Sequence, residues 1–253
     1  MNDLTNNVRV SAFYRLCEVL LQNELVQQRS NVSLVRVAGT NIYTSDSDRP
    51  WVFLNEGGRP ESSVTVYDGV NDVTNYVKIH HLNQPEIVSG ALSRPSVTYS
   101  GPPSGAAKAS FSQFVVMPMV GYPVEKQLEQ VVLPVAAVSV DLSEDDHFAL
   151  GTALKFRRFT IHVDLLARNK VERDRVTDII RCNMARIPIL DWAQHQLLNG
   201  DGTVDSAFDY LTQFKNFARI PTPPRSFILN SETMTTEKER FRTQTSIRIE
   251  IVG

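Results

Sequence analysis

Between Phe156 and Leu190 the hydrophobic pattern changes its period from two to about 3.6, which predicts a strand followed directly by a helix. Such alternation is expected when one face of a sheet is buried and the other is solvated. The apolar positions of the predicted strand are Phe159, Ile161, Val163 and Leu165, and the polar positions are Arg158, Thr160, His162 and Asp164. This strand-to-helix unit fixes one part of the fold, and it contains no recognisable catalytic motif.

The helical half of this unit has apolar residues three and four positions apart, at Val176, Ile179, Ile180, Met184 and Ile187. Asn169 is followed three residues later by Glu172, a spacing that predicts a capping box at the start of the helix. Proline cannot continue a helix, so Pro188 is predicted to end it.

Other segments predict further elements of the same kinds. An amphipathic helix is expected from about Leu4 to Arg29, and strands from Val131 to Leu142 and from Thr245 to Val252. The acidic segment 144–151 is predicted to form a turn between two neighbouring strands. After Pro188 we expect a short helix or interfacial turn, and then a partly helical segment at 207–220.

The stretch from Val32 to Met117 contains short β-rich pieces separated by clusters of Asp, Asn, Ser, Gly and Pro, which predicts hairpins and loops. Within it, Leu92–Ser112 combines prolines, glycines, serines and alanines. We predict that Leu92–Ser112 is an exposed loop or arm, because it offers little apolar surface to bury.

The bulk composition excludes several classes of protein. With 253 residues, 42% hydrophobic and 21% charged, the chain can bury a globular core, and its net charge of -2 gives no general attraction to polyanions. The N-terminus lacks the pattern of a signal peptide, and no apolar run approaches a membrane span. We expect a soluble protein made in a cytoplasm. Only Cys17 and Cys182 occur, both on patterned helix faces, where we expect core thiols.

Two glycine-rich segments resemble ligand loops without meeting their requirements. Ser100–Ser110 has Ala107 and Ala109 on either side of Lys108, whereas a phosphate-binding loop needs Gly before the lysine and Ser or Thr after it. Asn199–Asp205 cannot form a calcium loop, because the ligand positions would fall on apolar residues. We predict a loop and a tight turn.

The titratable and aromatic residues offer weak candidates for a site. His80 and His81 are adjacent and cannot share a metal on a strand, whereas Asp145, Asp146 and His147 form the densest acid–base cluster. For the aromatic residues a core position is the default and an interface position the alternative: Trp51, Trp192, Phe208, Tyr210, Phe214 and Phe217. We predict no catalytic, cofactor-binding or metal-binding residue, and no cofactor.

The segment from Phe148 to Asp191 resembles the strand–helix core of neck and tail-completion proteins of tailed bacteriophages, most of all the tail terminators. The similarity lies in the Ala-Leu-Gly sequence at 149–151, the arginine-led strand, Asn169 before the helix and the sequence that follows it to Trp192. The C-terminal strand extends it. The resemblance implies an α+β fold in which a mostly antiparallel β-sheet packs against α-helices. We expect one such domain, 1–253, and this chain departs from the family by carrying a β-rich insertion or arm at about 32–117.

The resemblance also implies a function without an active site. Such a protein forms a ring, expected to be a hexamer, at the head–tail neck of the virion after assembly in the host cytoplasm. It caps or terminates the tail tube and joins it to the connector, and it contacts the sheath where the tail is contractile. Genome DNA passes through the lumen without sequence-specific binding, and no membrane is involved.

Three alternatives stay open. The chain could be another neck ring, either a head–tail connector or a sheath-stabilising adaptor, because the insertion departs from a minimal terminator. It could be a soluble enzyme of unknown activity that uses Asp145, Asp146 and His147. It could also be an adaptor that binds another protein through the β-rich insertion.

Overall fold

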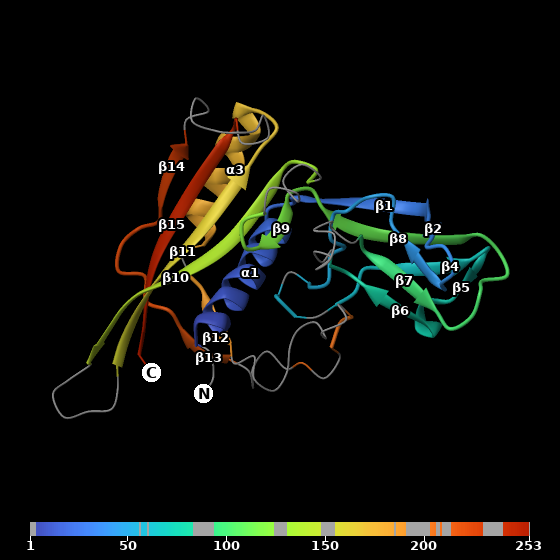
Figure 1. Cartoon of the computed structure of the whole chain (residues 1–253), viewed down its shortest axis with the longest axis horizontal. Helices are drawn as coiled ribbons and strands as arrows, with labels where there is room; N and C mark the ends of the chain where they lie inside the picture. The colour runs from blue at the N-terminus through green and yellow to red at the C-terminus, as the bar shows by residue number, and fades with distance from the viewer. Residues whose placement is uncertain are drawn as a thin grey trace.

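The computed structural model of the chain is shown in Figure 1. It describes residues 4–55, 57–59, 61–82, 94–123, 131–147, 155–184, 186–190, 203–205, 208, 214–229 and 240–252. Within these ranges the architecture is α+β, with mostly antiparallel sheets, as the resemblance implied.

A five-stranded sheet is built around the strand predicted at the start of the strand-to-helix unit. Its strand order is β14-β15-β11-β10-β9, and all neighbours are antiparallel except the parallel pair β9 and β10. The strands are β9 (Met117–Val120), β10 (Val135–His147), β11 (Lys155–Leu166), β14 (Arg225–Leu229) and β15 (Arg242–Val252). The alternation seen in the sequence is confirmed, because the apolar side chains of β11 and β15 are buried on one face.

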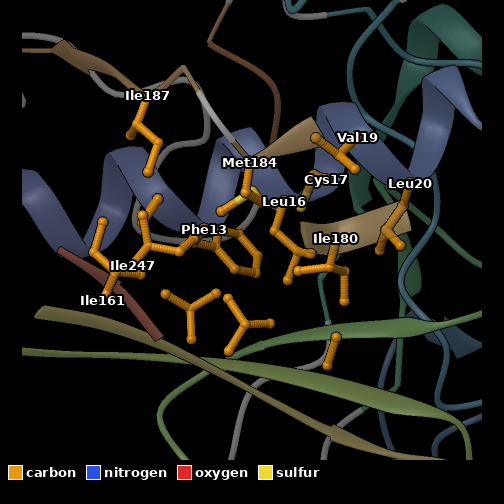
Figure 2. Packing of buried hydrophobic residues seen from close by; sticks show 14 of the residues in the cluster. Phe13, Leu16, Cys17, Val19, Leu20, Ile161, Ile180, Met184, Ile187 and Ile247 are labelled. Carbon is orange, nitrogen blue, oxygen red and sulfur yellow. The ribbon is translucent and has the colours of Figure 1, made fainter. Parts of the chain in front are cut away.

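Two α-helices among the described residues cover that face: α1 (Leu4–Gln22) and α3 (Lys170–Asn183). Figure 2 shows Phe13 and Leu16 of α1 and Ile180 of α3 packed over Ile161 and Ile247 of the sheet. Burying a side chain of this size contributes about 1.5–3 kcal/mol. The predicted helical spacing therefore corresponds to a real apolar stripe against the sheet.

The start of α3 agrees with the predicted cap only in part. The Asn169 side chain accepts a hydrogen bond from the backbone N–H of Glu172 at 2.9 Å. The carboxylate of Glu172 instead accepts from the backbone N–H of Arg168 at 2.9 Å, one residue earlier than in a capping box. The prediction that Pro188 ends the helix is wrong, because α3 ends at Asn183 and Pro188 begins strand β12 (Pro188–Leu190).

The N-terminal helix is shorter than the predicted Leu4–Arg29. It ends at Gln22, where the Asn23 side chain donates to the backbone carbonyl of Val19 at 2.8 Å and Glu24 takes a φ of 57°. The chain then enters strand β1 (Val26–Ser33). The helical spacing of apolar residues continues to Leu25, which is buried in the turn. The pattern alone therefore predicted a helix that is too long.

The β-rich insertion contains two four-stranded sheets, of order β1-β8-β4-β5 and β2-β3-β7-β6. Besides β1, their strands are β2 (Val35–Arg36), β3 (Ile42–Thr44), β4 (Thr65–Asp68), β5 (Asn71–Asp72), β6 (Val77–His80), β7 (Ser96–Tyr99) and β8 (Ala107–Phe114), and the short 3₁₀ helix η1 (Thr74–Tyr76) precedes β6. Both sheets contribute to a second hydrophobic core around Trp51, Val97 and Phe111.

The prediction that Leu92–Ser112 is an exposed loop or arm is wrong where strands β7 and β8 form, and it is confirmed for residues 100–106 between them, which are a mostly exposed loop. β7 and β8 take up much of the segment, and Val97, Ala109 and Phe111 are buried. Alternate residues are small, and small side chains fit a tightly packed sheet as well as they fit a loop. Composition therefore misled the prediction.

Two more sequence predictions are corrected after β10 and β12. Residues 144–147 continue β10 in place of the predicted turn, because they pair with Lys155–Arg158 of β11. The partly helical segment predicted at 207–220 contains strand β13 (Phe214–Phe217), which pairs with β12. The short helix or turn expected at 190–198 lies outside the described residues except for Leu190, which ends β12.

Arg49 joins the insertion to the five-stranded sheet. Its buried guanidinium donates to the carbonyls of Val115, of Leu133 at 2.6 Å and of Val132 at 3.4 Å. Burial lowers the pKa of this guanidinium. Since a buried cation is costly unless its donors are satisfied, these carbonyls fix where the end of β8 meets the segment before β10.

Candidate assembly surfaces

The structure gives structural roles to most residues that the sequence offered as chemical candidates. The backbone N–H groups of Ser104 and Gly105 in the loop that resembles a phosphate-binding loop donate to the carboxylate of Asp68. These hydrogen bonds lower the pKa of Asp68. Amides that would have to wrap a phosphate are therefore engaged by the protein's own anion, in agreement with the rejection of that motif.

The histidines have separate polar partners. His80 shares a hydrogen bond with Thr98 at 3.2 Å, and buried His81 shares one with Ser62 at 2.9 Å. Within the described ranges, no three His, Cys, Asp or Glu side chains are grouped so that they could hold a metal. The glycine-rich turn at Asn199–Asp205 is described only from Thr203 onward.

The two cysteines differ. Cys17 is fully buried in α1, and burial raises the pKa of its thiol, as expected for a core thiol. Cys182 is exposed on α3, so the expectation of a core position is wrong for it. Its neighbour Arg181 is exposed as well, which places Cys182 at the margin of the apolar stripe.

The aromatic candidates that are described lie in the cores. Trp51 is fully buried and packs on Phe111 with ring centroids 4.7 Å apart, and Phe208 is buried in the main core. Phe214 and Phe217 belong to β13, but the description does not extend to their side chains. Trp192 and Tyr210 lie outside the described residues.

Asp145, Asp146 and His147 lie at the end of β10, opposite Arg157, Phe156 and Lys155 of β11. Sequence analysis placed this cluster in a turn, and the register places it on one strand of a hairpin. The description covers the backbone of these three residues and not their side chains. The acidic end of β10 therefore pairs with the basic start of β11.

The face of the sheet opposite the helices carries a polar network. Asp164 is buried and accepts hydrogen bonds from Arg242 at 2.7 Å and from Gln244 at 3.3 Å, and the Arg242 guanidinium lies 4.3 Å from the centroid of the Tyr122 ring. The His162 ring lies between two polar partners, with Nδ1 3.0 Å from the Ser246 hydroxyl and Nε2 3.4 Å from the Asp141 carboxylate. This network keeps most of the charge on the face compensated.

A second part of that face is a depression of about 400 Å³ beside the segment that leads to β14. The carboxylate of Glu250 forms ion pairs with the guanidinium groups of Arg158 at 3.1 Å and Arg219 at 3.8 Å. Arg248 and Thr222 also line the depression. Two of the three arginines are therefore paired with the same carboxylate. The surface carries only a small excess of positive charge.

Both edges of the five-stranded sheet stay open within the described part of the chain. β14 pairs only with β15, and its Phe227 and Ile228 are 52% and 60% exposed. On the other side, β9 covers β10 only from Val135 to Val138. The rest of β10 continues with β11 as a hairpin that projects beyond the helices (Figure 1).

Sequence analysis missed these two edges. Residues 225–229 contain Phe and Ile at neighbouring positions, a pattern that does not alternate and that we did not assign to a strand. The signal for the projecting hairpin was present as an acidic run at 144–146 followed by a basic run at 155–158. Opposite charges at matched distances from a turn favour pairing of the two runs.

Comparisons with known proteins add no relative. No family model, curated protein or solved structure matches the chain. Among the described helices, none is long and apolar enough to cross a bilayer.

Proposed function

We propose that this chain is a structural virion protein of a tailed phage that forms a ring at the head–tail neck, caps or terminates the tail tube and joins it to the connector. The proposed ring is a hexamer with no catalytic role. Its partners are copies of itself, the neighbouring connector and tube proteins and, in a contractile tail, the sheath.

The observation that carries the proposal is the five-stranded sheet with one face covered by helices and both edges open. A ring protein needs a rigid core and two different surfaces that meet head to tail. Fully buried Leu16, Phe159 and Ile247 supply the rigid core, and the β14 edge and the β10 hairpin supply two unlike surfaces. The resemblance of 148–191 to tail terminators directs this general scheme to the phage neck.

The polar face opposite the helices supports a channel for DNA. A lumen that conducts DNA without holding it needs arginines whose charge is compensated, since uncompensated arginines bind phosphates. On this face Arg158 and Arg219 are paired with Glu250, and Arg242 is paired with Asp164. We place this face toward the lumen.

The test is electron microscopy of the purified full-length chain, alone and mixed with tail tubes from the same phage. We expect closed rings in negative stain, rings at one end of the tubes, and tubes that stop lengthening when the chain is added to polymerising tube protein. Monomers in both samples and unlimited tube growth would contradict the proposal.

Another neck ring is the second candidate, because the far end of the insertion also offers apolar contacts. Val70 is 93% exposed and Tyr76 is 77% exposed. If the chain is a connector or sheath-stabilising adaptor, Val70→Ser with Tyr76→Ser should abolish binding of that neighbour and leave the ring intact. The exposed valine Val171 on α3 offers a matched control, Val171→Ser.

A further inference from the structure

The β14 edge has the features of a strand that pairs with another chain. Phe227 and Ile228 occupy adjacent positions and are both more than half exposed, so apolar surface lies on both faces of this edge strand. Exposed edges of this kind add strands from partners unless they are protected. Pro221, Pro223 and Pro224 precede β14 and prevent a ladder from continuing past Arg225, which limits pairing to β14 itself.

The complementary edge lies at the other side of the same sheet. Beyond Val138, β10 has β11 on one side, and no described strand lies on its other side as far as His147. This free edge is acidic, with Asp141, Glu144, Asp145 and Asp146 and no basic residue other than His147. Asp141 is 75% exposed.

Charge distinguishes the two edges. β14 contains exposed Arg225 and no acidic residue, whereas Arg219, before the prolines, is paired with Glu250. A basic edge that meets an acidic edge of another copy is favoured, whereas contact between two like edges is disfavoured by repulsion. The charges therefore favour a head-to-tail contact over a two-fold one.

Strand direction fits the same contact. β14, β15, β11 and β10 are joined by three antiparallel steps, so β14 runs antiparallel to β10 within the chain. Rotating one copy onto the next about a ring axis that lies close to the strand direction leaves the directions of the strands unchanged. The β14 of one copy then meets the β10 of the next as an antiparallel pair, the more stable kind of ladder.

The position of β9 sets the stagger of this pairing. The registers place β14 at the level of Val135–Ser139, where β9 already covers β10. On β11, Ser139 pairs with His162 and Asp146 pairs with Phe156. Moving Arg225 from the level of Ser139 to that of Asp146 therefore shifts a neighbouring copy by ~20 Å along the strands, against ~19 Å across four strand spacings. The resulting strand tilt is about 45°, at the upper end of the range in which sheets close into barrels.

We infer that the β14 edge of one copy pairs antiparallel with the free edge of β10 in the next copy, with Arg225 opposite Asp146, so that the five-stranded sheets join into one closed sheet. This inference rests on the proposed ring and names the surfaces that build it. In this register Ile228 stands opposite Leu142, and the bulge between Leu142 and Glu144 lies within the paired segment.

The experiment is a charge swap measured by sedimentation velocity over a range of concentrations. Arg225→Glu and Asp146→Arg each place like charges at every contact, and each should weaken association at least about tenfold. The two substitutions in one chain restore opposite charges and should recover association. Arg36→Glu on β2, an exposed arginine on the edge of a different sheet, is the matched control and should leave association unchanged.

The outcomes separate the inference from the proposed function. Circular dichroism first confirms that each variant is folded. If the wild type forms rings and neither reversal weakens them, or if the double variant fails to recover, the edge pairing is overturned while the ring stands. If the wild type sediments as a monomer both alone and with tail tubes, the edge pairing and the ring are overturned together.

Discussion

The five-stranded sheet and the β-rich insertion handle their sheet edges differently. In the first, two helices cover one face, and the open edges β14 and distal β10 belong to the strongest element of the fold. In the second, two small sheets share one core, and three of their four edge strands are short: β2 and β5 have two residues each and β6 has four, whereas β1 has eight. Short edge strands resist pairing with other chains, whereas longer ones offer a template for it.

This difference separates the part of the chain suited to self-assembly from the part suited to other contacts. Among its described strands, the insertion leaves only β1 as a long sheet edge, and it exposes Val70 between β4 and β5 and Tyr76 in η1. The five-stranded sheet leaves a basic edge and an acidic edge on opposite sides. We therefore expect the main sheet to join copies and the insertion to reach neighbouring proteins.

The sharpest way to break this comparison is to damage each core separately. Phe159→Ala removes a fully buried ring from the main core and should destabilise the protein by about 3–5 kcal/mol, as measured by chemical denaturation. Phe111→Ala in the second core should raise hydrogen exchange in β4 and β8 more than in β11 and β15. Equal loss of protection in both regions after Phe111→Ala would show that they unfold as one unit.

The second test concerns Arg49, which joins the insertion to the five-stranded sheet. Arg49→Met keeps much of the side-chain volume but leaves the carbonyls of Val115 and Leu133 without this donor, which should cost about 1.5–3 kcal/mol. Hydrogen exchange should increase first at the amides of Val115 and Met117, which bond to Leu25 and Pro134. Unchanged exchange at these amides would mean that Arg49 does not hold the two regions together.

A smaller effect is expected at the start of α3. Asn169→Ala removes the acceptor for the backbone N–H of Glu172 and should lower the free energy of unfolding by about 1 kcal/mol. Asn169→Ser is the control, because serine also caps helices and should restore most of the loss. Equal destabilisation by both substitutions would assign the effect to something other than the cap.

The smallest effect concerns Asp68 in the insertion. Its carboxylate is more acidic when folded than when unfolded, so the stability that it contributes is present above its ordinary pKa and is lost as the pH falls through the lowered folded value. In an NMR titration the amides of Ser104 and Gly105 should shift with a midpoint below the usual range for aspartate. A midpoint within that range, or no shift in Asp68-bonded amides compared with Asp68→Asn, would contradict the assigned hydrogen bonds.

The main sheet and its helices were predictable because burial on one face imposes a period. Phe159 to Leu165 and Ile247 to Ile251 alternate because every second residue lies against α1 and α3, and Val176 and Ile180 are spaced for the opposite side of the same core. Helix ends were less predictable. Leu25 is buried like a helical residue, yet the turn after Gln22 depends on the φ of Glu24, which spacing does not encode.

The insertion was harder to predict because its sheets are held by contacts distant in sequence. Ala107 and Ala109 resemble loop residues until β8 is seen between β1 and β4. The two sheet edges were missed for a different reason. An edge is defined by which strand lacks a neighbour, and the order β14-β15-β11-β10-β9 joins strands from three separate parts of the chain.

The most direct test of the account is disulfide formation between two singly substituted chains, both carrying Cys182→Ser to remove the exposed native thiol. One chain carries Ser226→Cys on β14, and the other carries Asp145→Cys on distal β10, the position opposite Ser226 in the inferred register. The account predicts that, when the two chains are mixed and oxidised, disulfides join unlike chains and not like ones. Disulfides within each unmixed preparation, or none in an assembled mixture, would contradict the head-to-tail joining of the sheets.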